Sequence, residues 1–130
     1  MTTLLLDTHV LHWWSAEPER LSDIATAALE TADELAVSDV TWLELARLGV
    51  ERRLVPPVPV RTWLEILARE VRTIPMSPAI AVAAMDLPRT FPGDPADRVI
   101  WATAIEHGLR LVTKDRRLLE QDEAGAITLW

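Results

Sequence analysis

The chain has 130 residues, a formal net charge of −7 and no cysteine. This length suits one domain with a substantial buried core, so we expect a single domain over residues 1–130. The absence of cysteine excludes disulfides and thiolate metal sites, and the longest apolar runs are too short to span a bilayer. Since the N-terminus has no basic targeting segment, we expect a soluble cytoplasmic protein with no membrane partner. The acidic balance argues against non-specific nucleic-acid binding, unless bound cations reverse the charge at one place.

The first half of the chain alternates short apolar runs with helical patterns. The unbroken apolar run at its start favours a central strand of a parallel sheet, covered on both faces. Ser22 can cap a helix that turns Ile24 inward, and Gly49 can end the helix that follows the second strand. The expected elements are, in chain order, a strand at 3–6, a helix at 10–14, a helix at 22–32, a strand at 35–38 and a helix at 39–49.

The second half continues the alternation after a proline-rich connector at residues 56–59, which is no domain boundary because neither side could form a full core alone. Pro78 and Pro95 suit the first position of a helix, and Gly108 suits a helix end. The expected elements are a helix at 60–69, a strand at 71–74, a helix at 77–87, a turn at 88–93, a helix at 94–108, a strand at 109–113, a short helix at 116–120 and a strand at 126–129. This alternation predicts an α/β sandwich with a mostly parallel central sheet flanked by helices.

Four acidic residues fall where parallel strands would bring them to one edge of the sheet. Asp7 and Asp115 each follow a predicted strand. Glu44 and Asp97 lie on helices that start from, or pack beside, the same edge, where the ligand sites of such sheets form. Taken alone, Glu44 could be an ordinary solvent-exposed residue of its helix. Asp97 could be an acid that stabilises the first turn of a helix capped by Asp94. Taken together, the four acids could meet at one point.

A meeting of four carboxylates needs a cation, because their charges repel and raise some of their pKa values. Oxygen ligands alone suit Mg²⁺ or Mn²⁺, and the natural substrate of such a site is a phosphodiester. Water activated by the metal can then hydrolyse the bond without a side-chain nucleophile. Two groups of basic residues could line a path to the acids. They are Arg47, Arg52 and Arg53 in one group and Arg110, Lys114, Arg116 and Arg117 in the other.

Four segments together resemble the PIN domain, and within it the ribonuclease toxins of bacterial toxin–antitoxin pairs called VapC. They are residues 5–8, 38–46, 94–104 and 111–115, which occur in the family's order and spacing. The resemblance covers essentially the whole chain and implies one PIN-like domain, a three-layer sandwich. It also implies a Mg²⁺- or Mn²⁺-dependent endoribonuclease that leaves a 5′-phosphate and is held inactive by an antitoxin.

The resemblance implies a role for each matching residue. Asp7, Glu44 and Asp97 would be the core metal ligands, and Asp115 would be a fourth acid that positions a metal or its waters. His9 would be a packing or rim residue, because the family supplies no imidazole ligands. The residues expected to cap or hydrogen-bond beside the ligands are Asp94, Thr8, Ser38 and Thr113.

The partners that the resemblance implies are an RNA substrate, a cognate antitoxin and a second copy of the chain. Trp42 and Trp101 are expected to fill the core. Trp13, Trp14 and Trp63 are then too many for so small a core, and large exposed aromatic side chains tend to mark interfaces. We therefore expect these three to serve the homodimer or the antitoxin groove.

Two other functions stay open. One is a non-catalytic Mg²⁺-binding signalling module of the receiver kind, which also carries acids at strand ends, with Thr113 and Lys114 as a faint echo. Against it, neither the second nor the third predicted strand ends in the acid that would accept a phosphoryl group. The other is an inactive PIN-like module used only for binding, although the presence of all four acids counts against it.

Overall fold

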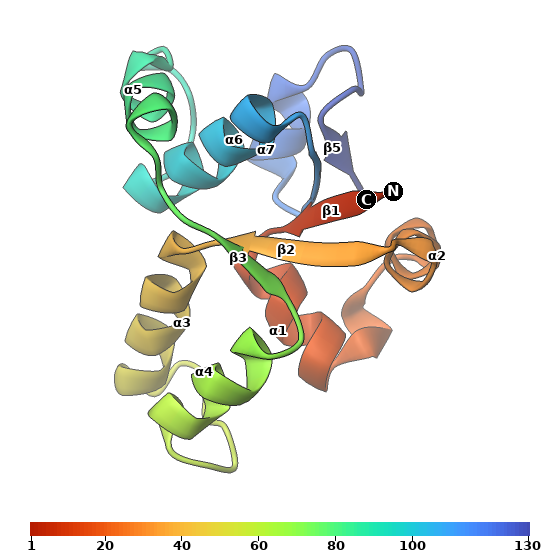
Figure 1. Ribbon diagram of the computed structural model, residues 1–130, viewed down its shortest axis with the longest axis vertical. Coiled ribbons are helices and arrows are strands. Elements are labelled where there is room, and N and C mark those ends of the chain that lie inside the picture. Colours follow the sequence, from red (N-terminus) through yellow and green to blue (C-terminus); the bar gives the residue numbers. More distant parts are fainter.

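The structure is a computed structural model that describes residues 1–130. Its centre is a five-stranded sheet of order β3-β2-β1-β4-β5, in which every neighbouring pair is parallel (Figure 1). The strands are β1 (Thr3–Leu6), β2 (Glu34–Ser38), β3 (Arg72–Ile74), β4 (Arg110–Val112) and β5 (Thr128–Leu129). The predicted α/β fold with a parallel central sheet is therefore confirmed.

Helices cover both faces of the sheet. In Figure 1, α5, α6 and α7 lie on one side of the strands, and α1, α3 and α4 on the other, with α2 at the end of β2. The buried side chains of α2 belong to the same cluster as those of α1, α3 and α4. The bounds of the helices are α1 (Thr8–Ala16), η1 (Pro18–Arg20, a 3-10 helix), α2 (Asp23–Thr31), α3 (Val40–Val50), α4 (Val60–Ala68), α5 (Pro78–Asp86), α6 (Pro95–His107) and α7 (Arg116–Gln121). None of these helices combines the length and apolar character that crossing a membrane requires.

The sheet separates two hydrophobic clusters, which explains the unbroken apolar run of β1. Leu4 and Leu6 belong to the cluster beneath α1, α2 and α4, whereas Leu5 belongs to the cluster beneath α5 and α6. Successive side chains of a strand point to opposite faces, so both faces of β1 are buried. The middle strand of the sheet is thus held rigidly from both sides, and its last residue is followed at once by Asp7.

Several helix ends follow local signals in the sequence. The Ser22 and Ser77 hydroxyls accept from backbone N–H groups in the first turns of α2 and α5. Gly108, with φ +62°, ends α6 in the left-handed conformation that glycine tolerates. Helix α1 begins at Thr8, earlier than the predicted residue 10, because the Asp7 side chain caps it.

Helix α3 ends at Val50, one residue beyond the predicted end near Gly49, while the inward orientation predicted for Ile24 is wrong. A Cβ atom on Gly49 would lie 2.7 Å from Cγ2 of Val60, so glycine here allows α3 and α4 to pack closely. Ile24 does not face the core, since 63% of its surface is exposed.

The tryptophans divide differently from the prediction. Trp101 fills the core as expected, with its ring 5.3 Å from that of Phe91. Trp63, which the composition predicts to lie at an interface, is buried in the core cluster beneath α1 and α4. Trp14 and Trp42 are half-buried against that same cluster. The space between α1, α3 and α4 is therefore large enough to take more indole rings than the composition suggested.

Candidate active site

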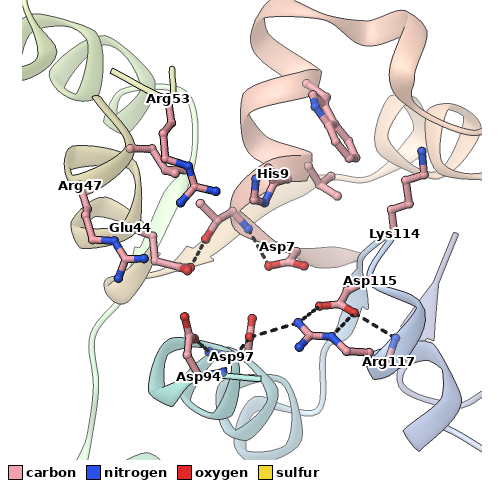
Figure 2. Close-up of a pocket in the computed structure, with 14 residues that line it drawn as sticks. Asp7, His9, Glu44, Arg47, Arg53, Asp94, Asp97, Lys114, Asp115 and Arg117 are labelled. Carbon is pink, nitrogen blue, oxygen red and sulfur yellow. Dashed lines mark hydrogen bonds and ion pairs between the residues drawn. The ribbon is translucent and has the colours of Figure 1, made fainter. Parts of the chain in front are cut away.

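The carboxyl ends of β1 and β4 open into a pocket of about 520 Å³. Five carboxylates line it and face a common space in Figure 2. They come from segments far apart in the sequence: the end of β1, helix α3, the start of α6 and the start of α7. The five are Asp7, Glu44, Asp94, Asp97 and Asp115. The structure thus brings together all four acids that the sequence singled out.

Asp7 is the most deeply buried of these acids. It directly follows β1, and its backbone N–H donates to the Val112 carbonyl of β4 (3.0 Å). The Thr113 hydroxyl donates to its Oδ2 (2.7 Å), and the Thr8 N–H donates to its Oδ1 (2.8 Å). Burial raises the pKa of Asp7, while these two hydrogen bonds act to lower it. The carboxylate is therefore fixed in place but carries its charge at a cost.

Glu44 projects into the pocket from α3 and is half-buried. The Thr8 hydroxyl donates to its Oε1 and also lies 3.2 Å from the Thr41 hydroxyl. Burial raises the pKa of Glu44 despite this hydrogen bond, and the charges of Asp7 and Asp94 raise it further. Thr8 therefore touches both acids: its backbone N–H holds Asp7, and its hydroxyl holds Glu44.

Asp97 forms a reciprocal capping box with Asp94 at the start of α6. The Asp97 N–H donates to Asp94 Oδ1, and the Asp94 N–H donates to Asp97 Oδ2, each at 3.1 Å. Burial, followed by the charges of Asp94 and Asp7, raises the pKa of Asp97 to about 7. Asp97 therefore both caps the helix and belongs to the acidic cluster. One of its carboxylate oxygens accepts the capping hydrogen bond, and the carboxylate also faces the other acids.

Asp115 caps α7 and forms a two-pronged ion pair with Arg117. The Arg117 Nε donates to Asp115 Oδ1 (3.2 Å), and its Nη2 donates to Oδ2 (2.9 Å). The hydrogen bond from the Arg117 side chain is the main reason that the pKa of Asp115 is lowered. Nη2 also lies 3.9 Å from Asp97 Oδ2, so Arg117 bridges the two acids (Figure 2).

Of the four residues expected to cap or hydrogen-bond beside the ligands, three do so and one does not. Thr8 and Thr113 bond to acids, and Asp94 caps α6. Ser38 is buried, and its hydroxyl accepts from the Val40 N–H (3.3 Å) at the start of α3, away from the pocket lining. The structure therefore does not bring Ser38 to the acids.

Basic residues surround the carboxylates, and the structure sorts the two groups found in the sequence. Four of their members line the pocket, while Arg52, Arg110 and Arg116 do not. The sequence alone could not separate them, because neighbours in the chain point in different directions. His9, expected at the rim, also lines the pocket, and its charged form acts to lower the pKa of Asp7. The lining members are Arg47, Arg53, Lys114 and Arg117.

The donor chemistry of the pocket fits a hard divalent cation, because its acidic side chains offer oxygen ligands and the chain has no thiolate. As placed, no three acidic or histidine side chains could hold one ion by direct ligation. Protein donors occupy the carboxylates instead: Thr113 on Asp7, Thr8 on Glu44 and Arg117 on Asp115. Mg²⁺ commonly takes one or two protein carboxylates and keeps several waters, so it does not need three direct protein ligands.

The chain is similar to known proteins in sequence and in fold. A family model described as PIN domain matches residues 4–124. Ribonuclease VapC22 of Mycobacterium tuberculosis is 56% identical over 130 residues, which cover 100% of both chains. A toxin–antitoxin complex from Klebsiella pneumoniae shares the fold with a TM-score of 0.70 at 22% identity, over 98% of this chain and 96% of that chain. VapBC2 of Rickettsia felis, bound to a promoter DNA fragment, has a TM-score of 0.71 at 18% identity, over 98% of both chains.

Proposed function

This chain belongs to the PIN domain family, and from that premise we propose that it is a divalent-metal-dependent endoribonuclease, the toxin of a toxin–antitoxin pair. The observation that carries the proposal is the convergence of Asp7, Glu44, Asp97 and Asp115 in one pocket at the carboxyl edge of the sheet. The raised pKa values of the first three support it: burial is the main cause and the charges of neighbouring acids add to it, so a bound cation would stabilise the ionised forms.

In this proposal Asp7, Glu44 and Asp97 would hold Mg²⁺ or Mn²⁺ in part through waters of the ion, since no three of the acids as placed could ligate it directly. Asp115 would orient the ion or its waters. When bound there, such a cation would supply Lewis-acid activation of water for hydrolysis of the phosphodiester. The hydrogen bonds from Thr113 to Asp7 and from the Thr8 hydroxyl to Glu44 keep the carboxylate oxygens oriented. These threonines therefore act as positioning residues.

The basic residues of the pocket suit a polyanionic substrate. Arg47 and Arg53 lie on one side of the acids, and Lys114 lies on the other (Figure 2). A strand of RNA crossing the acids would meet a cation before and after the bond to be cut. We therefore assign these three side chains to phosphate contacts, and the product is expected to carry a 5′-phosphate.

Because the chain belongs to the PIN family, the alternative of a receiver-like signalling module is rejected. The inactive binding module is disfavoured because all four acids reach the pocket and because threonines hold two of them. A module without chemistry has no need to place so many ionised groups together at a cost in stability.

The antitoxin and a second copy of the chain are proposed as protein partners. Exposed apolar side chains on the helices supply candidate contacts, in place of Trp63, which is buried. One set lies on or beside α3 and α4, and another lies on α5. The first set is Leu43, Val50, Val55 and Ile66, and the second is Val82 and Met85.

The nuclease proposal is tested with purified protein and total cellular RNA in Mn²⁺ or Mg²⁺. We expect cleavage that EDTA abolishes. The new 5′ ends should carry a phosphate, which is detected by ligation of an adapter that requires a 5′-phosphate. Asp97→Asn should remove cleavage, whereas Glu106→Gln, at an exposed acid of α6 outside the pocket, should cut like the parent. Equal cleavage by Asp97→Asn and the parent would contradict the assignment of the site.

The partner proposal is tested by co-expression with the product of an adjoining short reading frame. We expect the two proteins to purify together and cleavage to be suppressed in the complex. The mass of the isolated chain, measured by light scattering, should be that of a dimer. A chain that stays monomeric at all concentrations would contradict the homodimer, and an uninhibited nuclease would contradict the antitoxin.

A further inference from the structure

Trp13 is the one tryptophan that lines the acidic pocket. It lies on α1, the helix that Asp7 caps, and its side chain is half-buried. The exposed part of this large aromatic surface therefore faces the same space as the carboxylates. Filling the core does not explain this exposed part.

The ring of Trp13 is braced by two other rings. The His9 ring lies 5.9 Å away between centroids, one turn earlier on α1, and the Trp130 ring lies 6.1 Å away at the chain end. Both neighbours are tilted against the indole, by 48° and 57°. Such packing limits rotation of the side chain, so the ring presents a fixed surface at the pocket.

Two cationic side chains lie beside this ring, and one of them, Arg20, is also paired with Glu17 (3.2 Å). Lys114 Nζ lies 5.6 Å from the ring centroid, and Arg20 Cζ lies 5.8 Å from it. Both side chains are exposed, and Lys114 also lines the pocket. The combination of a fixed aromatic ring and exposed cations beside an acidic site is that of a single-strand binding surface, where bases stack and phosphates pair with basic groups.

We propose that Trp13 is a stacking platform for one nucleobase of the RNA substrate, with Lys114 contacting a phosphate next to that base. Stacking of a base on an aromatic ring is stronger than an exposed cation–π contact, so the base displaces the cation. The freed ammonium group then reaches the phosphate that arrives with the base. This inference rests on the proposed endoribonuclease function and adds a base subsite to it.

A packing role is the competing explanation, in which Trp13 only covers Trp130 and the chain end. The two explanations differ in one measurable property. A stacking platform couples to one particular base of the RNA, whereas a packing role lowers binding of every RNA alike. The test therefore varies the RNA and the protein together.

The experiment first maps where the wild-type protein cuts total RNA in Mn²⁺, which gives a short RNA containing the cut site. A series of such RNAs is made, each with one abasic ribose at a different position. Affinities are measured in an Asp97→Asn background so that no RNA is cut. Trp13→Leu and Trp13→Phe are compared in this background, with Trp42→Leu as the matched control, since Trp42 is half-buried outside the pocket and donates to Thr73.

We expect Trp13→Leu to bind the intact RNA about tenfold more weakly, and Trp13→Phe and Trp42→Leu to bind like the parent. One abasic position should cost the parent about tenfold and cost Trp13→Leu nothing further. Lys114→Gln should weaken all the RNAs alike and reduce the salt dependence of binding by about one phosphate contact.

Unchanged affinity in Trp13→Leu would overturn the stacking proposal. An equal loss for every abasic RNA would also overturn it and would assign Trp13 to packing. If the wild-type protein shows no metal-dependent cleavage, the proposed function fails and the base subsite with it. If the wild type cleaves RNA but no single abasic position removes the effect of Trp13→Leu, the base subsite is wrong and the proposed function stands.

Discussion

Gly93 lies against the side chain of Asp97 so closely that a Cβ atom at Gly93 would stand 2.7 Å from the Asp97 Cβ and overlap the carboxylate. Gly93 also has φ +96°, a conformation that residues with side chains rarely adopt. The loop before α6 therefore admits only glycine at this position. The space left by the missing side chain is the space in which Asp97 forms its capping box and faces the other acids.

Gly93→Ala should lower the free energy of unfolding by about 1–3 kcal/mol, through backbone strain and contact with Asp97. It should also reduce cleavage, because the Asp97 carboxylate must move. Urea denaturation and cleavage assays measure the two effects. Gly125→Ala is the matched control, since Gly125 has φ +65° but no atom within 4 Å of its would-be Cβ. It should lose stability and keep full cleavage, and a loss of cleavage in both variants would contradict a specific role for Gly93.

Neutralising Asp97 and neutralising Asp115 should change stability in opposite directions. In EDTA at pH 7, Asp97→Asn should raise the free energy of unfolding by about 2 kcal/mol, because burial and neighbouring charges oppose the ionised form. Asp115→Asn should lower it by up to about 1 kcal/mol, because the charge-assisted pair with Arg117 is lost. Chemical denaturation of both variants checks this. Destabilisation by Asp97→Asn would show that Asp97 is a capping residue outside any charge cluster.

The stability of the metal-free protein should increase as the pH falls from 7 towards 5. Burial raises the pKa values of Asp7, Glu44 and Asp97 above their ordinary values of 3.8, 4.5 and 3.8, and that of Asp97 reaches about 7. The folded state therefore binds more protons than the unfolded state in this window, so rising pH destabilises it. Thermal unfolding in EDTA measures the trend, which saturating Mg²⁺ should flatten by favouring the ionised forms. A melting temperature that falls from pH 7 to pH 5 in EDTA would contradict the cluster.

Thr113→Val should weaken metal binding as well as the fold. The variant removes the hydroxyl that donates to Asp7 Oδ2, which costs about 1–3 kcal/mol at a buried charged group. Loss of an orienting partner should reduce Mn²⁺ affinity about 10- to 100-fold, measured by calorimetry. Thr103→Val serves as control, because the buried Thr103 hydroxyl donates to the Val99 carbonyl within α6. If both variants bind Mn²⁺ equally well, Thr113 does not orient a ligand.

Much of the fold could be predicted because its signals are local. The Ser22 and Ser77 caps and the glycine end of α6 involve residues within a few positions of one another. The burial of Trp63 and the close contact at Gly49 do not follow from the sequence, because both depend on neighbours from other helices. Gly49 is defined by its contact with Val60 across the α3–α4 interface, which no periodicity within α3 could indicate.

The sequence predicts which acids meet in the candidate site but not which basic residues lie beside them. Asp7 and Asp115 follow strands, and parallel strands end at one edge, so their meeting follows from chain order. The bridge from Arg117 to Asp97 follows from no such rule, since it depends on how α7 turns against α6. The metal-ligand roles of the four acids stay a prediction for the experiments above to test.

By itself the sequence determined the alternation of strands and helices, the capped start of α6 and which acids lie at strand ends, because these depend on residues close together in the chain. Only the tertiary structure decided what each acid touches. The Thr113 hydroxyl that holds Asp7 lies 106 positions away in the chain, and Gly93 makes room for Asp97 through a backbone conformation that its neighbours impose. Contacts of this kind follow from the packing of whole elements, and packing is a property of the folded chain.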